Sequence, residues 1–330
     1  CVEYITQFDG THVLAVSTTS VARNRQLKEI IKTSAYNTIF SKIIIRKNSD
    51  IDLLNFIYQI LFLFQIYCYT RFHQIDKCVL GFYKCCDGRI GYSWLVRKNP
   101  KCELIACDDG VGTLLAVQER QNEIELNKPF VFFNNRVLKY YIELNPNKII
   151  PASIRYFTIY KITEAPCDFV SYNNYSYLKS NLSSFSVPED IVSRNIVFLG
   201  EPLYSGGYMK RSAYKQYIEM MSKHYRNEKI LYYAHPAEKK TEWDRLQLHC
   251  CEYVANILPF EIISALLPKG CIVASYISAV LSNLYYFNDK LSGIYICIEI
   301  KDLEDPHKYE IWEKTCKNFE SVGIKPVKFF

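Results

Sequence analysis

The sequence lacks the short motifs that mark several large enzyme classes. No G-x-G-x-x-G, P-loop, H-E-x-x-H or G-x-S-x-G pattern occurs in its 330 residues. This argues against dehydrogenases, NTPases, zincins and serine hydrolases. The 13 cysteines include no C-x-x-C pair, and four of them form the adjacent pairs Cys85-Cys86 and Cys250-Cys251. Such pairs suit neither disulfides nor zinc, so we expect a reducing, cytosolic environment and no structural metal. We also expect no cofactor.

Local runs of one charge are also missing. The formal net charge is +6, and basic and acidic residues are intermixed along the chain. Nucleic-acid binding would need a basic stripe, so we predict no nucleic-acid partner. The mild positive excess fits an anionic partner such as a sugar nucleotide, and it is compatible with peripheral contact to an anionic membrane surface.

A single apolar stretch approaches the length of a membrane span. It runs from Leu53 to Tyr69 and contains Asn55, Gln59 and Gln65. It is shorter than the roughly 20 apolar residues that a span needs. We therefore predict a buried helix of an α/β domain here.

Strands and helices alternate along the chain, which predicts an α/β protein with parallel sheets. The alternation is irregular before residue 165 and regular after residue 195. Between them, Tyr172-Asn173-Asn174-Tyr175-Ser176 and Val187-Pro188 are typical of a linker. We predict two Rossmann-like domains that face a central cleft. Residues 1–190 form an acceptor-side domain with the linker, and residues 191–330 form a domain that binds a nucleotide sugar.

Two polar motifs directly follow predicted strands. Asp108-Asp109-Gly110 follows the run 102–107, and His235-Pro236 follows the run 229–234. Ligands of open α/β sheets bind at the carboxyl ends of strands. A carboxylate at one strand end can act as a general base, and a histidine at another can assist a phosphate leaving group. The structural alternatives are an Asp-Gly turn with a helix cap and an ordinary loop histidine.

Three further residues are candidates for binding a nucleotide. Ser275 and Ser278 open a predicted helix after the run 271–274, where hydroxyls and backbone amides can hold phosphate. Glu261, behind a Leu-Pro-Phe segment, can accept hydrogen bonds from ribose hydroxyls. The alternatives are ordinary N-cap serines and a solvated glutamate in the first turn of a helix.

Together these motifs resemble the bacterial sialyltransferases of glycosyltransferase family 52, over roughly residues 100 to 330. The segments that carry the resemblance are Cys107-Asp108-Asp109-Gly110-Val111-Gly112-Thr113-Leu114, Phe198-Leu199-Gly200-Glu201-Pro202-Leu203, Tyr232-Tyr233-Ala234-His235-Pro236, Ser275-Tyr276-Ile277-Ser278-Ala279-Val280-Leu281 and Gly323-Ile324-Lys325-Pro326-Val327.

The resemblance implies a GT-B fold and metal-independent, inverting transfer from CMP-sialic acid to a sugar hydroxyl, with galactose the expected acceptor. The acceptor glycan would be lipooligosaccharide or capsule oligosaccharide. The enzyme would work in the bacterial cytoplasm, either free or bound peripherally to the inner membrane. His235 would assist departure of the CMP phosphate, which Ser275 and Ser278 would bind. The resemblance ranks Asp108 first, Asp109 second and Glu201 third as the base. Gly110, Pro236 and Glu261 are assigned to the donor side.

Other functions remain open from the sequence. One is a different GT-B glycosyltransferase or a polysialyltransferase, although a polyanionic product would favour a basic groove that the intermixed charges do not indicate. The alternative of another class is a catalytically idle glycan- or nucleotide-binding protein. A homodimer is compatible with every one of these functions.

Overall fold

The computed structural model of the chain describes residues 2–16, 28, 30–31, 38–47, 52–81, 83–108, 112–130, 138, 149–226, 228–255, 258–306 and 309–329. The chain forms two compact units. Unit 1 holds Cys1–Val21 and Tyr36–Tyr177, and unit 2 holds Ala22–Ala35 and Leu178–Phe330. The division after Tyr177 lies ahead of the predicted boundary at residue 190.

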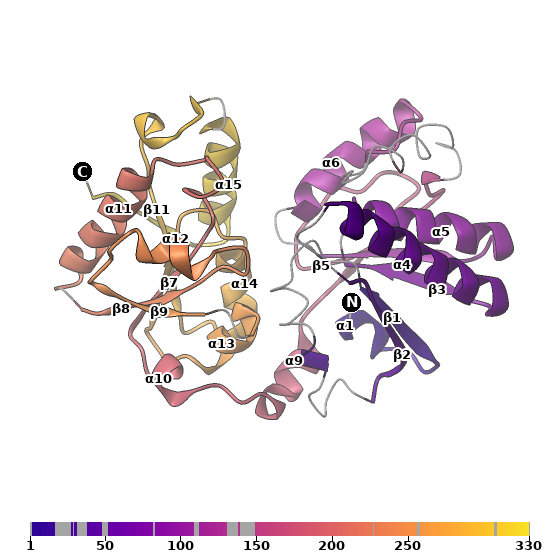
Figure 1. Cartoon of the computed structure of the whole chain (residues 1–330), viewed down its shortest axis with the longest axis horizontal. Coiled ribbons are helices and arrows are strands. Elements are labelled where there is room, and N and C mark those ends of the chain that lie inside the picture. Colours follow the sequence, from indigo (N-terminus) through magenta and orange to yellow (C-terminus); the bar gives the residue numbers. More distant parts are fainter. Residues whose placement is uncertain are drawn as a thin grey trace. The chain divides into compact units, whose positions relative to one another are not determined.

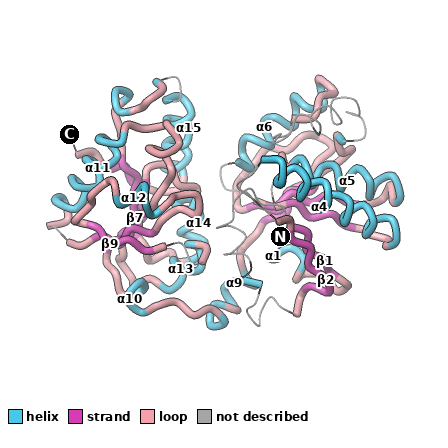
Figure 2. Tube along the Cα trace, in the orientation of Figure 1, coloured by secondary structure: helices cyan, strands magenta, loops and turns pink. Residues whose placement is uncertain are grey.

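Unit 2 is built on a six-stranded parallel sheet with the order β12-β11-β10-β7-β8-β9. Its strands are β7 (Ile196–Leu199), β8 (Ile230–Tyr233), β9 (Cys251–Val254), β10 (Ile272–Ser275), β11 (Ser292–Ile296) and β12 (Lys325–Val327). Every residue of β7 and β8 is buried, as expected for strands covered on both faces. The chain runs from β7 outward to β9, both labelled in Figure 2, and then crosses back to place β10 on the other side of β7.

The helices of unit 2 cover this sheet. Helix α11 presents Ala213, Tyr214, Tyr217, Ile218 and Met221 at helical spacing to the core, where they pack against β7 and β8 residues. The other helical elements are α10 (Glu189–Val192), α11 (Arg211–His224), α12 (Lys240–Asp244), α13 (Phe260–Leu266), α14 (Val280–Phe287), η2 (Ile300–Asp302) and α15 (Tyr309–Ser321).

Unit 1 contains a four-stranded parallel sheet with the order β3-β4-β5-β6 and a separate parallel pair, β1-β2. Its elements are α1 (Val2–Ile5), β1 (His12–Val16), β2 (Phe40–Ile45), α4 (Asp52–Phe72), β3 (Lys77–Leu80), α5 (Cys86–Lys98), β4 (Glu103–Cys107), α6 (Gly112–Glu125), β5 (Arg155–Thr158) and β6 (Phe169–Tyr172). The short helix α9 (Ser176–Ser180) contains the point in the chain where unit 1 ends and unit 2 resumes. The short helix η1 (Leu182–Ser184) follows at the start of unit 2.

Two strands of unit 1 fall where the sequence predicts irregular or linker structure. β5 is only four residues long, and β6 lies at the edge of the sheet with Phe169 and Tyr172 exposed. An edge strand with one open face loses the continuous apolar run that identifies a central strand. The segment expected to be a linker therefore begins inside the sheet.

Helix α4 differs from the predicted buried helix. It lies against α5 (Figure 1). Over Leu53–Phe72 its mean hydropathy is 1.4, yet only 22% of the window is buried. By length and composition it is the one helix among the described residues that could cross a membrane.

Candidate functional site

Three polar segments meet at the carboxyl ends of the central strands of unit 2. They follow β7, β8 and β10, which are neighbours in the order β10-β7-β8. The strand order reverses between β7 and β10, since the chain leaves β7 in one direction and returns on its other side. In doubly wound sheets the ligand crevice lies at this point. The candidate site is therefore this edge of the sheet, and all of its residues belong to unit 2.

Glu201 connects the segments after β7 and β10. Its Oε2 lies 2.8 Å from Ser275 Oγ and accepts hydrogen bonds from the backbone amides of Tyr276 and Ile277, both at 3.1 Å. Ser275 is completely buried, and its Oγ also lies 3.1 Å from Leu199 O. A phosphate contact for Ser275 would require these bonds to break. In this geometry Glu201 and Ser275 position the loop that leads into α14.

Burial raises the pKa of the Glu201 carboxyl from 4.5 to about 7. The three hydrogen bonds from Ile277, Ser275 and Tyr276 oppose this shift, while the charge of Glu238 adds to it. Desolvation of a buried carboxylate outweighs the donors that stabilise its charged form. Glu201 therefore changes protonation near neutral pH although its side chain is only 7% exposed.

A second carboxylate, Glu238, organises the segment after β8. Its Oε2 accepts a hydrogen bond from the His235 backbone amide at 2.8 Å, and its Oε1 accepts one from the Tyr232 hydroxyl at 2.6 Å. The Tyr232 hydroxyl lies 2.8 Å from that of Tyr214, whose hydroxyl also accepts from the Glu201 backbone amide at 3.3 Å. Burial raises the pKa of the Glu238 carboxyl. This chain of contacts joins both carboxylates to α11.

His235 is half-buried at the end of β8, followed by half-buried Pro236. Its Nδ1 accepts a hydrogen bond from the Ala237 backbone amide at 3.1 Å. A neutral imidazole with an accepting Nδ1 carries its proton on Nε2. His235 is thereby held as a hydrogen-bond donor at the strand edge, which is the form that can donate to a phosphate oxygen.

Gly200 leaves no room for a side chain beside these groups. A Cβ at this position would lie 2.8 Å from the Tyr232 hydroxyl and ring, and it would meet Glu238 Oε2 still more closely. The glycine lets the β7 loop approach the β8 segment. The sequence motif Leu199-Gly200-Glu201 therefore has a packing reason.

Ser278 and Glu261 lie on the α14 side of the site. Ser278 is half-buried just before α14, and the backbone amides of Ser278 and Ala279 donate to no other described residue. Amides at a helix N-terminus can bind phosphate. Glu261, in the first turn of α13, accepts a hydrogen bond from Asn283 Nδ2 of α14 at 3.3 Å, and burial raises its pKa. That contact ties α13 to α14.

In unit 1, Asp108 repeats the arrangement of Glu201. It directly follows β4, and its Oδ2 accepts a hydrogen bond from the Ile159 backbone amide, which follows the neighbouring strand β5, at 2.8 Å. Its Oδ1 is buried with no hydrogen-bond partner among the described residues. Burial raises the pKa of the Asp108 carboxyl, and the hydroxyl groups of Thr158 and Thr113 oppose this shift. The candidates Asp109 and Gly110 lie outside the described residues.

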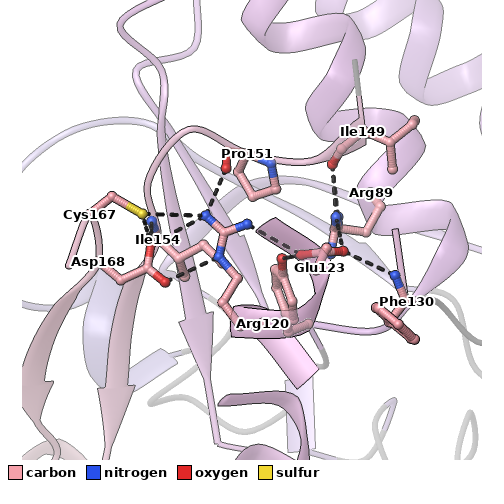
Figure 3. A network of polar contacts seen from close by, with 10 residues as sticks. Arg89, Arg120, Glu123, Phe130, Ile149, Pro151, Ile154, Cys167 and Asp168 are labelled. Carbon is pink, nitrogen blue, oxygen red and sulfur yellow. Dashed lines mark hydrogen bonds and ion pairs between the residues drawn. The ribbon is translucent and has the colours of Figure 1, made fainter. Parts of the chain in front are cut away.

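Sequence reasoning missed a network of buried charges in unit 1 (Figure 3). Glu123 pairs with Arg89 at 2.8 Å and with Arg120 at 3.3 Å, and Arg120 also pairs with Asp168 at 3.1 Å. Arg89 further donates to Ile149 O. All four side chains are buried and come from α5, α6 and the turn before β6. Their mutual pairing indicates a structural role. No local sequence pattern predicts this pairing.

The described residues contain no group of three or more His, Cys, Asp or Glu side chains that could hold a metal ion. What the unit 2 site offers is a histidine donor, two buried carboxylates that fix its loops, and open amides before α14. These groups can bind an anion, and they can stabilise it by hydrogen bonds when it acts as a leaving group.

Comparison with protein-family models gives no match, and neither does comparison with curated protein sequences. Among solved structures, the chain is similar to a putative UDP-N-acetylglucosamine 2-epimerase from Listeria monocytogenes, with a TM-score of 0.52 and 10% identity over 97% of this chain and 82% of that one. It is also similar to the UDP-GlcNAc 2-epimerase of Methanocaldococcus jannaschii (TM-score 0.43, 13% identity, 94% and 86% covered). A third is the spinosyn forosaminyltransferase SpnP (TM-score 0.43, 9% identity, 88% and 73% covered).

The chain has a GT-B-type fold with two Rossmann-like domains, as predicted. The resemblance to family 52 sialyltransferases is wrong, because no family model matches and the similar structure with a TM-score of 0.52 is described as a putative UDP-N-acetylglucosamine 2-epimerase. The motifs that suggested it are polar residues that follow strands, at the edge where open α/β sheets bind their ligands. Ser275, for example, is explained here by contacts inside the fold.

Proposed function

We propose that the protein is a sugar-nucleotide enzyme, a glycosyltransferase that moves a sugar from a nucleotide-linked donor to a hydroxyl group of a glycan. The observation that supports it most strongly is the convergence of Gly200, His235 and the amides before α14 at the switch point of the unit 2 sheet. Phosphate groups favour this place in α/β sheets.

In this proposal the donor's phosphates lie against the Ser278 and Ala279 amides, and His235 Nε2 donates a hydrogen bond to the leaving phosphate. Transfer breaks the bond between the sugar and the phosphate oxygen, so negative charge grows on that oxygen. A hydrogen-bond donor beside that oxygen, such as His235 Nε2, stabilises the transition state more than the ground state. Glu201, Glu238 and Ser275 are positioning residues that hold the two loops.

Asp108 is the proposed base that takes the proton of the acceptor hydroxyl. Two observations support this role: the pKa of the Asp108 carboxyl is raised, and its Oδ1 has no hydrogen-bond partner among the described residues. A base with a raised pKa accepts a proton more readily, and it must reach the hydroxyl directly or through one water.

The test is a donor panel. The purified chain is incubated with UDP-, GDP- and dTDP-linked sugars, with and without oligosaccharide acceptors, and released nucleotide is measured. We expect release that depends on acceptor for one donor class, and loss of that release in His235→Ala. No release with any donor, or equal release without acceptor, would overturn the proposal.

Epimerisation of a nucleotide sugar is the second candidate, because the Listeria structure described as a putative 2-epimerase has the same fold along 97% of this chain. The two activities differ in their products. NMR of the sugar after incubation without acceptor would show a new epimer if the protein is an epimerase. A transferase leaves the donor sugar unchanged under that condition.

A further inference from the structure

Helix α4 carries a continuous apolar face that no described element covers. Seven large apolar side chains of this helix are between 41% and 79% exposed. They are Leu53, Ile57, Ile60, Leu61, Phe64, Tyr67 and Phe72. Most recur every three or four residues, so they lie on one side of the helix. A contiguous exposed patch of this kind marks an interaction surface rather than ordinary surface scatter.

The opposite side of α4 fixes the helix to unit 1. Gln59 Nε2 donates to Asp87 Oδ1 of α5 at 2.7 Å, and both side chains are buried. Leu63 is buried with Ile90 of α5. Breaking the buried Gln59–Asp87 bond would leave polar groups unsatisfied. The helix is therefore held on the domain and presents its apolar face outward.

A groove lies between α4 and β2, next to this face. Its volume is about 510 Å³, and its apolar lining includes Ile43, Ile45, Phe64 and Phe72. The cationic Lys42 also lines it, with Nζ 5.0 Å above the Tyr69 ring, and His73 stacks on the same ring at 3.9 Å. A groove of apolar walls with a cation at its rim suits an acyl chain joined to an anionic headgroup.

Positive charge is concentrated around the same elements. Residues 40–101 hold ten Lys and Arg against four Asp and Glu, and three of the ten, Arg46, Lys84 and Arg89, are buried in ion pairs. The exposed cations are Lys42, Lys47, Arg71, Lys77, Arg97, Lys98 and Lys101. Lys98 Nζ donates to the Arg71 and His73 carbonyls at 2.9 and 3.0 Å, which brings the cationic end of α5 to the end of α4.

We propose that the α4 face docks on the surface of an anionic lipid bilayer, with α4 lying in the plane of the interface and the α4–β2 groove taking one lipid chain. Apolar side chains alone bind a bilayer weakly, and adjacent cations add attraction to anionic lipids. Residues 40–101 supply both. The inference is independent of the proposed transferase activity, because it requires only the folded unit 1.

Vesicle co-sedimentation tests this with the full chain. Vesicles of phosphatidylcholine alone are compared with an equimolar mixture of phosphatidylcholine and phosphatidylglycerol. We expect binding to the mixed vesicles that weakens as NaCl rises from about 0.1 M to about 0.5 M, because screening shortens the electrostatic attraction. The double variant Leu61→Gln/Phe64→Gln should bind at least about tenfold more weakly, since burial of two large apolar side chains is lost.

Two controls separate the apolar and charged contributions. Leu126→Gln changes a leucine that is 65% exposed beyond α6, and it should bind like the wild type. Lys42→Glu/Arg97→Glu should lose the preference for anionic vesicles, whereas Lys223→Glu/Lys325→Glu on unit 2 should keep it. Thermal unfolding confirms that each variant is folded.

Three results would overturn the proposal. The wild type could fail to sediment with mixed vesicles, or the Leu61→Gln/Phe64→Gln variant could bind them as tightly as the wild type. Light scattering could instead show a dimer that this variant dissociates, in which case the α4 face joins two copies of the chain.

Discussion

Glu201 Oε2 lies 2.8 Å from Ser275 Oγ, although the two residues are 74 positions apart in the chain. The contact spans the ends of β7 and β10, the pair of strands between which the sheet order reverses. Because the Tyr276 and Ile277 amides bond to the same oxygen, one carboxylate sets the course of the loop into α14. The site at this edge depends on that carboxylate.

The protonation of Glu201 should make stability depend on pH. Its folded-state pKa of about 7 lies above the ordinary value of 4.5, so the folded chain binds more protons than the unfolded chain between these values. The free energy of unfolding should therefore fall as pH rises from about 4.5 to about 7, by up to about 3 kcal/mol. Urea unfolding of wild type and Glu201→Gln across this range measures the difference. A difference that stays constant with pH contradicts the assignment.

Sequence patterns predicted the parts of the fold that depend on continuous burial. The run 229–234, predicted as a strand ahead of His235, contains β8 because that strand is apolar and buried throughout. β5 and β6 were not predicted, because both are short and β6 is an edge strand. The segments that meet at the site were predicted from their place after strands, which parallel topology brings to one edge.

The roles of individual side chains could not be predicted in the same way. Whether Ser275 faces a ligand or the core depends on a carboxylate 74 residues away. The ion pairs Arg89–Glu123 and Arg120–Asp168 likewise join elements that are distant in sequence. The exposure of α4 was missed because an apolar helix has the same composition on the surface as in a core.

Gly200→Ala should destabilise unit 2. The added methyl group would press on the buried Tyr232 ring and on Glu238, and overpacking of this kind costs about 1–3 kcal/mol. Gly293→Ala in β11 is the matched control, because its nearest atom, Leu284 Cδ1, lies at an ordinary 3.5 Å. Thermal unfolding compares the two. Equal melting temperatures would show that the β7 loop accommodates a side chain.

His235→Ala should lower turnover by about 10²–10⁴-fold, the usual contribution of a positioned acid or hydrogen-bond donor. The fold should survive, because the bond from the backbone amide of residue 235 to Glu238 does not need the imidazole. His249→Ala, an exposed histidine, serves as the control. Normal turnover in His235→Ala would make His235 an ordinary loop residue.

Asp108→Asn should abolish transfer to the acceptor while nucleotide affinity is retained. Asparagine can still accept the hydrogen bond from the Ile159 amide, so the loop after β4 should keep its conformation. It cannot take a proton from a hydroxyl group. Transfer rates and nucleotide titrations of the same preparation measure both properties. Retained transfer would remove Asp108 from the role of base.

Glu123→Ala should cost about 3–5 kcal/mol of unfolding free energy, because it leaves Arg89 buried and unpaired. Glu313→Ala removes the ion pair with Lys317 on α15, whose side chains are 53% and 71% exposed, and should cost no more than about 1 kcal/mol. Urea unfolding of both variants provides the comparison. Similar costs would indicate that the buried network contributes no more than a surface pair.

Hydrogen exchange with and without nucleotide tests the central claim most directly. The account predicts that the nucleotide of the accepted donor slows amide exchange in residues 234–237 and 276–280, at the ends of β8 and β10. UDP, GDP, dTDP and CMP are compared in parallel, with His235→Ala as the weakened binder. Protection confined to other parts of the chain, or no protection by any of the four nucleotides, would contradict a sugar-nucleotide enzyme with its donor site at this edge.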